Sequence, residues 1–260
     1  MSWFVVCLVA LIASALTLFS GFGLGTLLLP AFALVFPAEL AIAATAVVHL
    51  ANNLFKLALI GRHARFATVL AFGLPALAGA LIGAWLLTWL SDLPVVATYE
   101  LAGRRIEVSA LGLAVGVLIV TFAFFELRPD NGSALARRIG MTWGGLFSGF
   151  FGGLSGHQGA LRSAFLVGSG LTKEQFIATG VWCAVMVDVS RLVIYGLAFL
   201  GPLFSGAREG GSLLLAATLC AFAGAWLGVR MIGKVTLAGV RRLVGVLLVL
   251  VGAAMAAGWL

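Results

Sequence analysis

The sequence predicts an all-α integral membrane protein built from two inverted repeats, each with a glycine-broken re-entrant helical hairpin and three transmembrane helices. Three observations lead to this fold class. Apolar residues make up 62% of the 260 residues and the mean hydropathy is +1.16, well above the apolar share of a soluble domain. The apolar residues form about eight segments, most of them of membrane-spanning length. Two stretches about 135 residues apart also match each other, which is typical of secondary transporters.

The charge and cysteine content argue against a soluble domain. Only 10% of residues are charged, too few to build a water-facing surface. The N-terminus has no basic cluster, so we expect no cleaved signal peptide. Cys7, Cys183 and Cys220 are scattered in apolar surroundings without metal-ligand spacing, which favours small core residues. The net charge of +7 suits basic loops beside anionic lipid headgroups, so the expected partner is the lipid bilayer and not nucleic acid.

Two of the apolar segments are too long for one crossing of the bilayer. The segments cover 3–36, 38–60, 67–90, 109–126, 139–171, 172–199, 211–232 and 235–258. The first and the fifth exceed the roughly 20 residues of a membrane helix, and each has a glycine cluster near its middle. We predict that each is a pair of half-helices with a non-helical tip, broken at Gly21, Gly23 and Gly25 and at Gly156 and Gly159. Such a tip must be buried in protein or line a cavity, because unpaired backbone groups in lipid are costly.

The distribution of basic residues favours hairpins over single crossings. If 139–171 returns to its starting side, ten basic residues fall on one side of the membrane and three on the other; if both long segments cross, the split is seven to six. Basic loops prefer the cytoplasm, so the uneven split is favoured. The loop with Arg104 and Arg105 and both chain termini are then external. The ten residues are Arg62, Arg65, Arg128, Arg137, Arg138, Lys173, Arg230, Lys234, Arg241 and Arg242.

The matching stretches divide the chain into a first transmembrane repeat (1–126), a cytoplasmic linker (127–138) and a second repeat (139–260). A hairpin plus three crossings is an odd number of crossings, so the two repeats are expected to be inverted. Small-residue pairs within the third segment of each half suit close packing of membrane helices. The aligned pairs are Glu39 with Glu174, Ile42 with Ile177, Asn53 with Asp188, Lys56 with Arg191 and Gly61 with Gly196, and the small-residue pairs are Gly79 with Gly83 and Gly224 with Gly228.

Polar side chains inside the apolar segments form the candidate site. Thr45, His49, Asn52, Asn53 and Lys56 recur every three or four residues and therefore share one helix face. In the second half, the glycine break contains polar residues and is followed by a basic one, and an acidic and a basic residue lie three apart on the next segment. Ionisable groups in a membrane tend to face a bundle interior or a water-filled path. Because basic groups outnumber acidic ones and helix N-termini at the breaks add positive charge, the pattern predicts a small anion as substrate.

The expected roles follow from the chemistry of each side chain. Arg162, Arg191 and Lys56 would supply charge, and His157, Gln158, Asn52 and Asn53 would supply hydrogen bonds. Asp188 and His49 are candidates for coupling to H⁺, because a buried carboxylate or imidazole can change its protonation near neutral pH; Na⁺ stays an alternative coupling ion. Each residue also has a structural alternative: Lys56 could extend to the interface, Asp188 and Arg191 could be a structural pair, and the histidines could bond to neighbouring helices or cap the break.

The glycine motifs resemble those of a known family. Ser20-Gly-Phe-Gly-Leu-Gly-Thr-Leu-Leu-Leu-Pro30 is similar to the glycine-rich signature of the TauE/SafE sulfite exporter family, also called the toluene sulfonate uptake permease family (TSUP), and the stretch 152–162 resembles its second copy. The resemblance implies transport of small sulfur oxyanions or organosulfonates (sulfite, sulfoacetate, taurine-related sulfonates or thiosulfate) across a bacterial inner membrane. His157-Gln158 and Arg162-Ser163 depart from the usual second copy, which leaves the exact substrate open.

We therefore expect a secondary transporter of small anions that works by alternating access and has no cofactor. An intramembrane enzyme with His157 or His49 as a base is an alternative, although no nucleophile–base pair or metal-ligand cluster is visible. A membrane assembly subunit is a further alternative. Small-residue helix faces could serve a homodimer or internal packing equally well.

Overall fold

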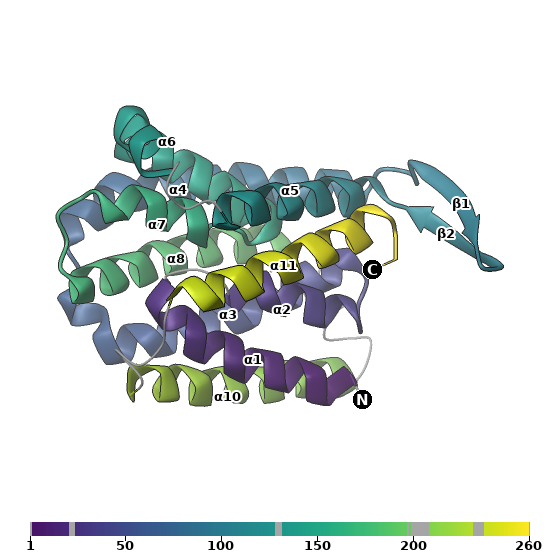
Figure 1. Cartoon of the computed structure of the whole chain (residues 1–260), viewed down its shortest axis with the longest axis horizontal. Coiled ribbons are helices and arrows are strands. Elements are labelled where there is room, and N and C mark those ends of the chain that lie inside the picture. Colours follow the sequence, from purple (N-terminus) through teal and green to yellow (C-terminus); the bar gives the residue numbers. More distant parts are fainter. Residues whose placement is uncertain are drawn as a thin grey trace.

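The computed structural model describes residues 2–20, 24–127, 132–196, 198, 208–230 and 237–259. These residues are mostly helical, and the helices lie side by side along one long direction (Figure 1). Among the described residues, four helices are long and apolar enough to cross a membrane, and further apolar helices are shorter. The helices are α1 (Ser2–Ser20), α2 (Leu24–Ala33), α3 (Ala38–Ile60), the 3₁₀ turn η1 (Gly61–His63), α4 (Phe66–Ser91), α5 (Ala110–Leu127), α6 (Gly132–Ser155), α7 (Gly159–Val167), α8 (Lys173–Tyr195), α10 (Arg208–Arg230) and α11 (Leu237–Ala256).

The second long segment folds as a helical hairpin. Helix α6 ends at Ser155, and α7 returns along it, so that the Ser148 hydroxyl donates to the Gln158 carbonyl at 2.9 Å. The break includes Gly156, whose φ of +81° suits glycine. Gly159 is the first residue of α7. Residues 132–138 of the expected linker are already helical and precede a kink at Gly140.

The first long segment is also divided into two helices. Helix α1 ends at Ser20 and α2 begins at Leu24, and the two pack against each other. Gly21 and Gly23 lie outside the described residues. Gly25 is described, and it lies within α2 rather than in the break.

One short element departs from the predicted all-α fold. Strands β1 (Ala97–Leu101) and β2 (Arg104–Val108) form an antiparallel hairpin. Ala102 and Gly103 in its turn have φ of 51° and 75°, the positive values that a tight two-residue hairpin turn requires. The Tyr99 hydroxyl donates to the Ala257 carbonyl at 2.7 Å, which ties the hairpin to the end of α11. The hairpin and both chain ends lie at the same end of the molecule (Figure 1).

Close packing between helices depends on small residues. A Cβ on Gly79 or Gly83 of α4 would overlap the carbonyl oxygens of Leu146 or Phe150 of α6, and a Cβ on Gly224 of α10 would overlap a carbonyl oxygen of α1. These glycines let the backbones touch, as the sequence predicted. In both contacts, residues later in one helix meet residues later in the other. Helix α4 therefore runs parallel to α6, and α10 runs parallel to α1.

Two other helix pairs are antiparallel. Helices α3 and α8 meet at Asn53 with Asp188 and at Gly61 with Trp182. Helices α5 and α11 meet where Gly112 approaches the Met255 carbonyl and Gly245 approaches Leu127. In each pair, residues later in one helix contact residues earlier in the other, so the two helices run in opposite directions.

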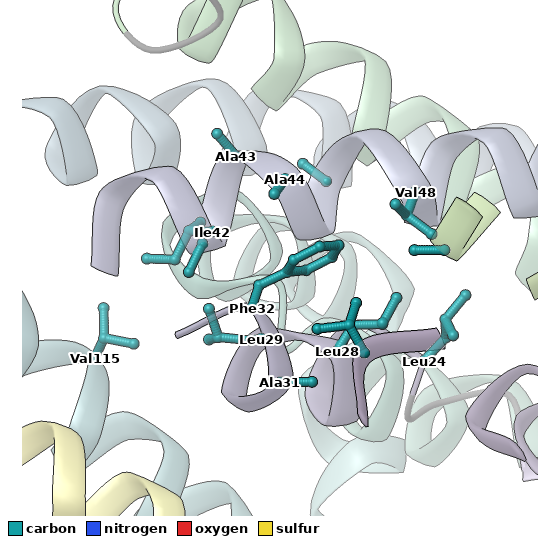
Figure 2. Packing of buried hydrophobic residues seen from close by; sticks show 14 of the residues in the cluster. Leu24, Leu28, Leu29, Ala31, Phe32, Ile42, Ala43, Ala44, Val48 and Val115 are labelled. Carbon is teal, nitrogen blue, oxygen red and sulfur yellow. The ribbon is translucent and has the colours of Figure 1, made fainter. Parts of the chain in front are cut away.

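The main hydrophobic core lies toward the end that carries the β-hairpin. Figure 2 shows Phe32 of α2 beside Ile42 of α3, with Leu28 one turn earlier on α2, and Val115 of α5 belongs to the same cluster. The same cluster includes Met255, two residues before the carbonyl that Tyr99 contacts. The opposite half of α3, which leads into η1, borders the candidate site.

Candidate functional site

A small cavity lies where the starts of α2 and α7 meet α3 and α8. Its polar wall is formed by residues of both half-helices and of α3, and its apolar wall by the first turns of α8. The volume is about 40 Å³, whereas one water needs roughly 10–15 Å³ on this measure, so the cavity suits a ligand of a few heavy atoms. The lining includes Leu24, Gly25, Thr26, His49, Asn53, Lys56, Gly156, Gln158, Gly159, Arg162, Ser163 and Gly180.

The N-termini of two half-helices border this cavity. Helix α2 begins at Leu24 and α7 begins at Gly159, and both residues line the wall. The first turn of a helix has backbone N–H groups without intrahelical partners, and the helix dipole adds partial positive charge there. Two such ends facing one space favour an anion over a cation.

Asp188 is the acceptor at the centre of the polar network. Its carboxylate is fully buried and pairs with Arg191, whose Nη2 lies at 2.8 Å. His49 Nδ1 lies 2.6 Å from the other carboxylate oxygen, to which Asn53 Nδ2 also donates at 3.0 Å. A contact of 2.6 Å to a carboxylate places a proton between the two groups, so the His49 ring is oriented by Asp188. The network joins α3 to α8 at the level of the cavity.

Gln158 connects this network to Arg162. Its amide nitrogen lies 3.4 Å from Asp188 Oδ1, and its amide oxygen accepts from Arg162 Nη1 at 3.1 Å. Arg162 is buried and packs over Gly180, where a Cβ would lie 3.4 Å from its Nε. Both side chains therefore have fixed positions on the cavity wall, as expected for groups that orient a ligand.

Lys56 lies on the same wall but bonds in another direction. It is buried, with 5% of its surface exposed, so it does not extend to an interface. With the Asn52 amide in its better orientation, Lys56 Nζ donates to Asn52 Oδ1 at 3.1 Å, and the amide nitrogen donates to the Ala221 carbonyl. Asn52 also bonds to Ser14 of α1 at 3.1 Å. Asn52 therefore links α1, α3 and α10 behind Lys56 instead of facing the cavity.

Arg191 is held behind the cavity wall. Its Nε donates to Asp188 at 3.1 Å, and its Nη1 lies 3.5 Å from the Gly152 carbonyl at the end of α6. The neighbouring Tyr195 hydroxyl donates to the Gly153 carbonyl. Tyr195 thus satisfies a carbonyl at the C-terminal end of α6, whereas the Gly152 carbonyl also accepts from the Gly156 N–H. Both side chains hold the end of α6 beside α8.

His157 also lies away from the cavity, on the other side of the break. It is 3% exposed, and its ring stacks on Phe122 of α5 with centroids 6.1 Å apart. His157 Nδ1 lies 3.1 Å from the Ser155 hydroxyl oxygen, which itself donates to the Phe151 carbonyl. His157 thus contacts α5, whereas the next residue, Gln158, faces the cavity.

The comparison with known families identifies the chain. The family model described as Sulfite exporter TauE/SafE matches residues 6–255, nearly the whole length. The chain belongs to this family. No curated protein and no solved structure matches this TauE/SafE chain. Membership makes it a membrane transport protein for sulfur-related anions, and agrees with its apolar helices.

The structure divides the predicted site residues of this TauE/SafE protein into two groups. One group lines the cavity: His49, Asn53, Lys56, Gln158 and Arg162, together with Gly25, Gly156 and Gly159. The other lies around it: Asn52, His157, Asp188 and Arg191. No group of three or more His, Cys, Asp or Glu side chains that could hold a metal occurs in the part of the chain that the structure describes.

The prediction of site residues omitted part of the wall. Thr26, Ser163 and Gly180 line the cavity, and Tyr195 holds the end of α6. Ser163 directly follows Arg162, and Gly180 lies two helical turns before Asp188, so helical spacing was a usable signal for both. Nothing in the sequence indicated that Tyr195 would reach Gly153, 42 residues away.

Proposed function

We propose that this chain is a secondary transporter that moves small sulfur oxyanions or organosulfonates, such as sulfite, sulfoacetate, taurine-related sulfonates or thiosulfate, by alternating access. The observation that carries the proposal is the cavity between the starts of α2 and α7. Two helix N-termini meet there with Lys56 and Arg162 on one wall. This combination of half-helix ends and basic side chains suits the oxygens of a small anion.

The charge of the site supports an anionic substrate. Lys56, Arg162 and Arg191 are basic, and Asp188 is the acidic residue to which Arg191 is bonded. All four are buried within segments that lie in the membrane. Charges are costly in this medium, so an excess of basic groups is best stabilised by an anion from solution. The small volume favours sulfite or thiosulfate over larger sulfonates in this conformation.

The directions of the helices support an inverted duplication. The sequence aligns α3 with α8, and the two run antiparallel; the last helices of the halves, α5 and α11, are antiparallel as well. Equivalent elements that run in opposite directions are typical of inverted repeats. We place the β-hairpin and the termini outside the bacterial inner membrane, because the more basic loops then lie in the cytoplasm.

Alternating access agrees with the position of the cavity. The cavity lies toward the start of α8 and η1, which are joined by the Trp182 contact to the Gly61 carbonyl. The hydrophobic core around Phe32 and Ile42 fills the other side, toward the β-hairpin. We infer that the cavity is accessible from one side of the membrane in this conformation. Transport then requires the hydrophobic core to open so that the cavity is accessible from the other side.

We propose H⁺ as the coupling ion, carried by His49 and Asp188. The carboxylate is 0% exposed, whereas the imidazole is 12% exposed and lines the cavity. A proton that reaches Asp188 from the cavity would therefore pass through His49. Their 2.6 Å contact allows this transfer without rearrangement of either side chain.

The test is anion-dependent thermal stability of the purified protein. Sulfite, sulfate, thiosulfate, taurine, sulfoacetate, acetate and phosphate are compared, with Arg162→Ala as the binding variant and Arg104→Ala in the exposed β2 strand as the matched control. A ligand at about 100 times its Kd stabilises the folded state by about 2.7 kcal/mol. We expect sulfur oxyanions to stabilise the wild type and the control but not Arg162→Ala. Equal stabilisation of all three proteins would refute the assigned site.

A further inference from the structure

Gly180 lines the cavity at a position where the fold does not require glycine. It lies inside α8, away from both ends, and its φ is not in the positive range that favours glycine. Among the described residues outside its own stretch of helix, a Cβ there would approach Arg162 Nε at 3.4 Å and Leu166 Cδ1 at 3.9 Å, both ordinary van der Waals contacts. Alanine would therefore fit, and it would also favour the helix, because glycine weakens a helix interior.

The glycines that join neighbouring helices differ in this respect. A Cβ on Gly79, Gly149 or Gly153 would overlap a backbone carbonyl oxygen of the facing helix, so small residues are required there for close packing. Both atoms near a Cβ on Gly180 belong to side chains of α7 and not to its backbone. The missing side chain at this position therefore does not serve helix packing. The space that it leaves belongs to the cavity, whose wall includes Gly180.

The cavity has a polar wall and an apolar wall, and Gly180 belongs to the apolar one. Phe176, Ile177 and Val181 of α8 line the same side. The polar wall is formed by the starts of α2 and α7 with Lys56 and Arg162. Anionic oxygens are stabilised by helix N-termini and basic side chains, whereas a polar atom placed against an apolar wall loses its hydrogen bonds to water. A bound oxyanion is therefore expected to turn its oxygens away from α8.

One methyl group at position 180 would take a large share of the cavity. A water needs roughly 10–15 Å³ on this measure, and a methyl group is of similar size, so it would remove about a quarter to a third of the 40 Å³. This share corresponds to one non-hydrogen atom of a small ligand. Gly180 thus determines whether the site can hold an anion with one atom more than sulfite.

We propose that Gly180 is a specificity-determining residue, which gives the site room for one weakly hydrated atom attached to a sulfur oxyanion. This inference rests on the proposed transport function and deepens it. Thiosulfate fits this description: its three oxygens would face the polar wall, and its terminal sulfur would lie against Gly180. Sulfate is of similar size, but its fourth oxygen would lose hydrogen bonds at the apolar wall. The site therefore prefers thiosulfate to sulfate, and sulfite leaves the space beside Gly180 unused.

The experiment compares three anions on three purified proteins. Affinities of wild type, Gly180→Ala and Val189→Ala for sulfite, thiosulfate and sulfate are measured by thermal-shift titration, because a ligand that binds the folded state raises its stability. Val189→Ala is the matched control. Val189 lies on the same helix with 46% of its surface exposed and does not line the cavity, and its replacement by alanine also favours the helix.

We expect wild type and Val189→Ala to bind thiosulfate about ten-fold or more tightly than sulfate, since sulfate would leave one oxygen without hydrogen bonds. Gly180→Ala should bind thiosulfate about ten-fold or more weakly than the wild type does, and sulfite within about three-fold, because overpacking affects only the larger anion.

Two results would overturn the role of Gly180 and leave the transport function intact. One is an unchanged thiosulfate affinity in Gly180→Ala, which would show that the space is not used. The other is an equal loss of sulfite and thiosulfate binding, which would show that Gly180 acts by positioning Arg162. If Gly180→Ala fails to fold, the wild-type preference for thiosulfate over sulfate decides, and equal affinities overturn the proposal. A wild type that binds none of the three anions would overturn both proposals.

Discussion

Replacing Gly156 by alanine tests whether the tip of the second hairpin positions Arg191. Gly156 has a φ of +81°, and a left-handed backbone costs a residue with a β-carbon roughly 1–2 kcal/mol. The new Cβ would also lie 2.9 Å from Arg191 Nη1, too close for an ordinary contact. The guanidinium must move away from Asp188 and Gly152, and overpacking of this kind adds about 1–3 kcal/mol. We expect a total loss of stability of about 2–5 kcal/mol.

Gly170→Ala is the matched control for this change. Gly170 has a φ of +69°, but a Cβ there would meet nothing within 4 Å, so the backbone cost of roughly 1–2 kcal/mol stands alone. Thermal unfolding of both purified variants, with and without sulfite, measures the difference. We expect Gly156→Ala to unfold at a lower temperature than Gly170→Ala and to lose most of the stabilisation by sulfite. Equal unfolding temperatures with an intact sulfite response would refute the role given to the tip.

Three more changes test other parts of the structure by thermal unfolding. Asp188→Asn keeps the shape but leaves the Arg191 guanidinium buried without its carboxylate, which should cost about 3–5 kcal/mol; an unchanged unfolding temperature would contradict the buried ion pair. Gly149→Ala should cost about 1–3 kcal/mol or more, since its Cβ would overlap the Ala76 carbonyl of α4. Tyr99→Phe should cost about 0.5–1.5 kcal/mol through the lost hydrogen bond to the C-terminal end and leave sulfite binding unchanged, which a lowered affinity would disprove.

The bounds of the helices could be predicted closely because they follow the length of each apolar segment. The expected segment 38–60 coincides with α3, and 67–90 differs from α4 by one residue at each end. Continuous apolar runs bounded by charged or glycine residues fix such limits without reference to the rest of the chain. The two long segments divide in the structure as predicted, since glycine clusters near their middle weaken a continuous helix.

The β-hairpin could not be predicted because its signal is weak. The strands are five residues long, and the turn uses Ala102 and Gly103 where Asn-Gly or Asp-Gly would be the usual marker. It is also stabilised from outside by Tyr99, which reaches residues at the far end of the chain. A contact over 158 residues leaves no local pattern in the sequence.

The candidate site was predictable as a set of residues but not as an arrangement. Helical spacing correctly placed His49, Asn53 and Lys56 on one face, and the structure brings all three to the cavity. The same spacing included Asn52, which instead bonds to Ser14 of α1. One helical position separates Asn52 from Asn53, so the direction of each amide depends on which helix packs beside it. That information lies in tertiary packing.

The positions of Lys56 and Arg191 follow from a single difference between aligned helices. The sequence aligns Lys56 with Arg191 and Asn53 with Asp188, three residues earlier in each case. Asp188 pairs with its own basic neighbour, Arg191. The fully buried side chain of Arg191 lies against the end of α6. Asn53 carries no charge and donates to Asp188, so Lys56 bonds to Asn52 and stays on the cavity wall. One acidic residue in place of an amide thus determines which of two equivalent basic side chains holds the helix break and which faces the ligand.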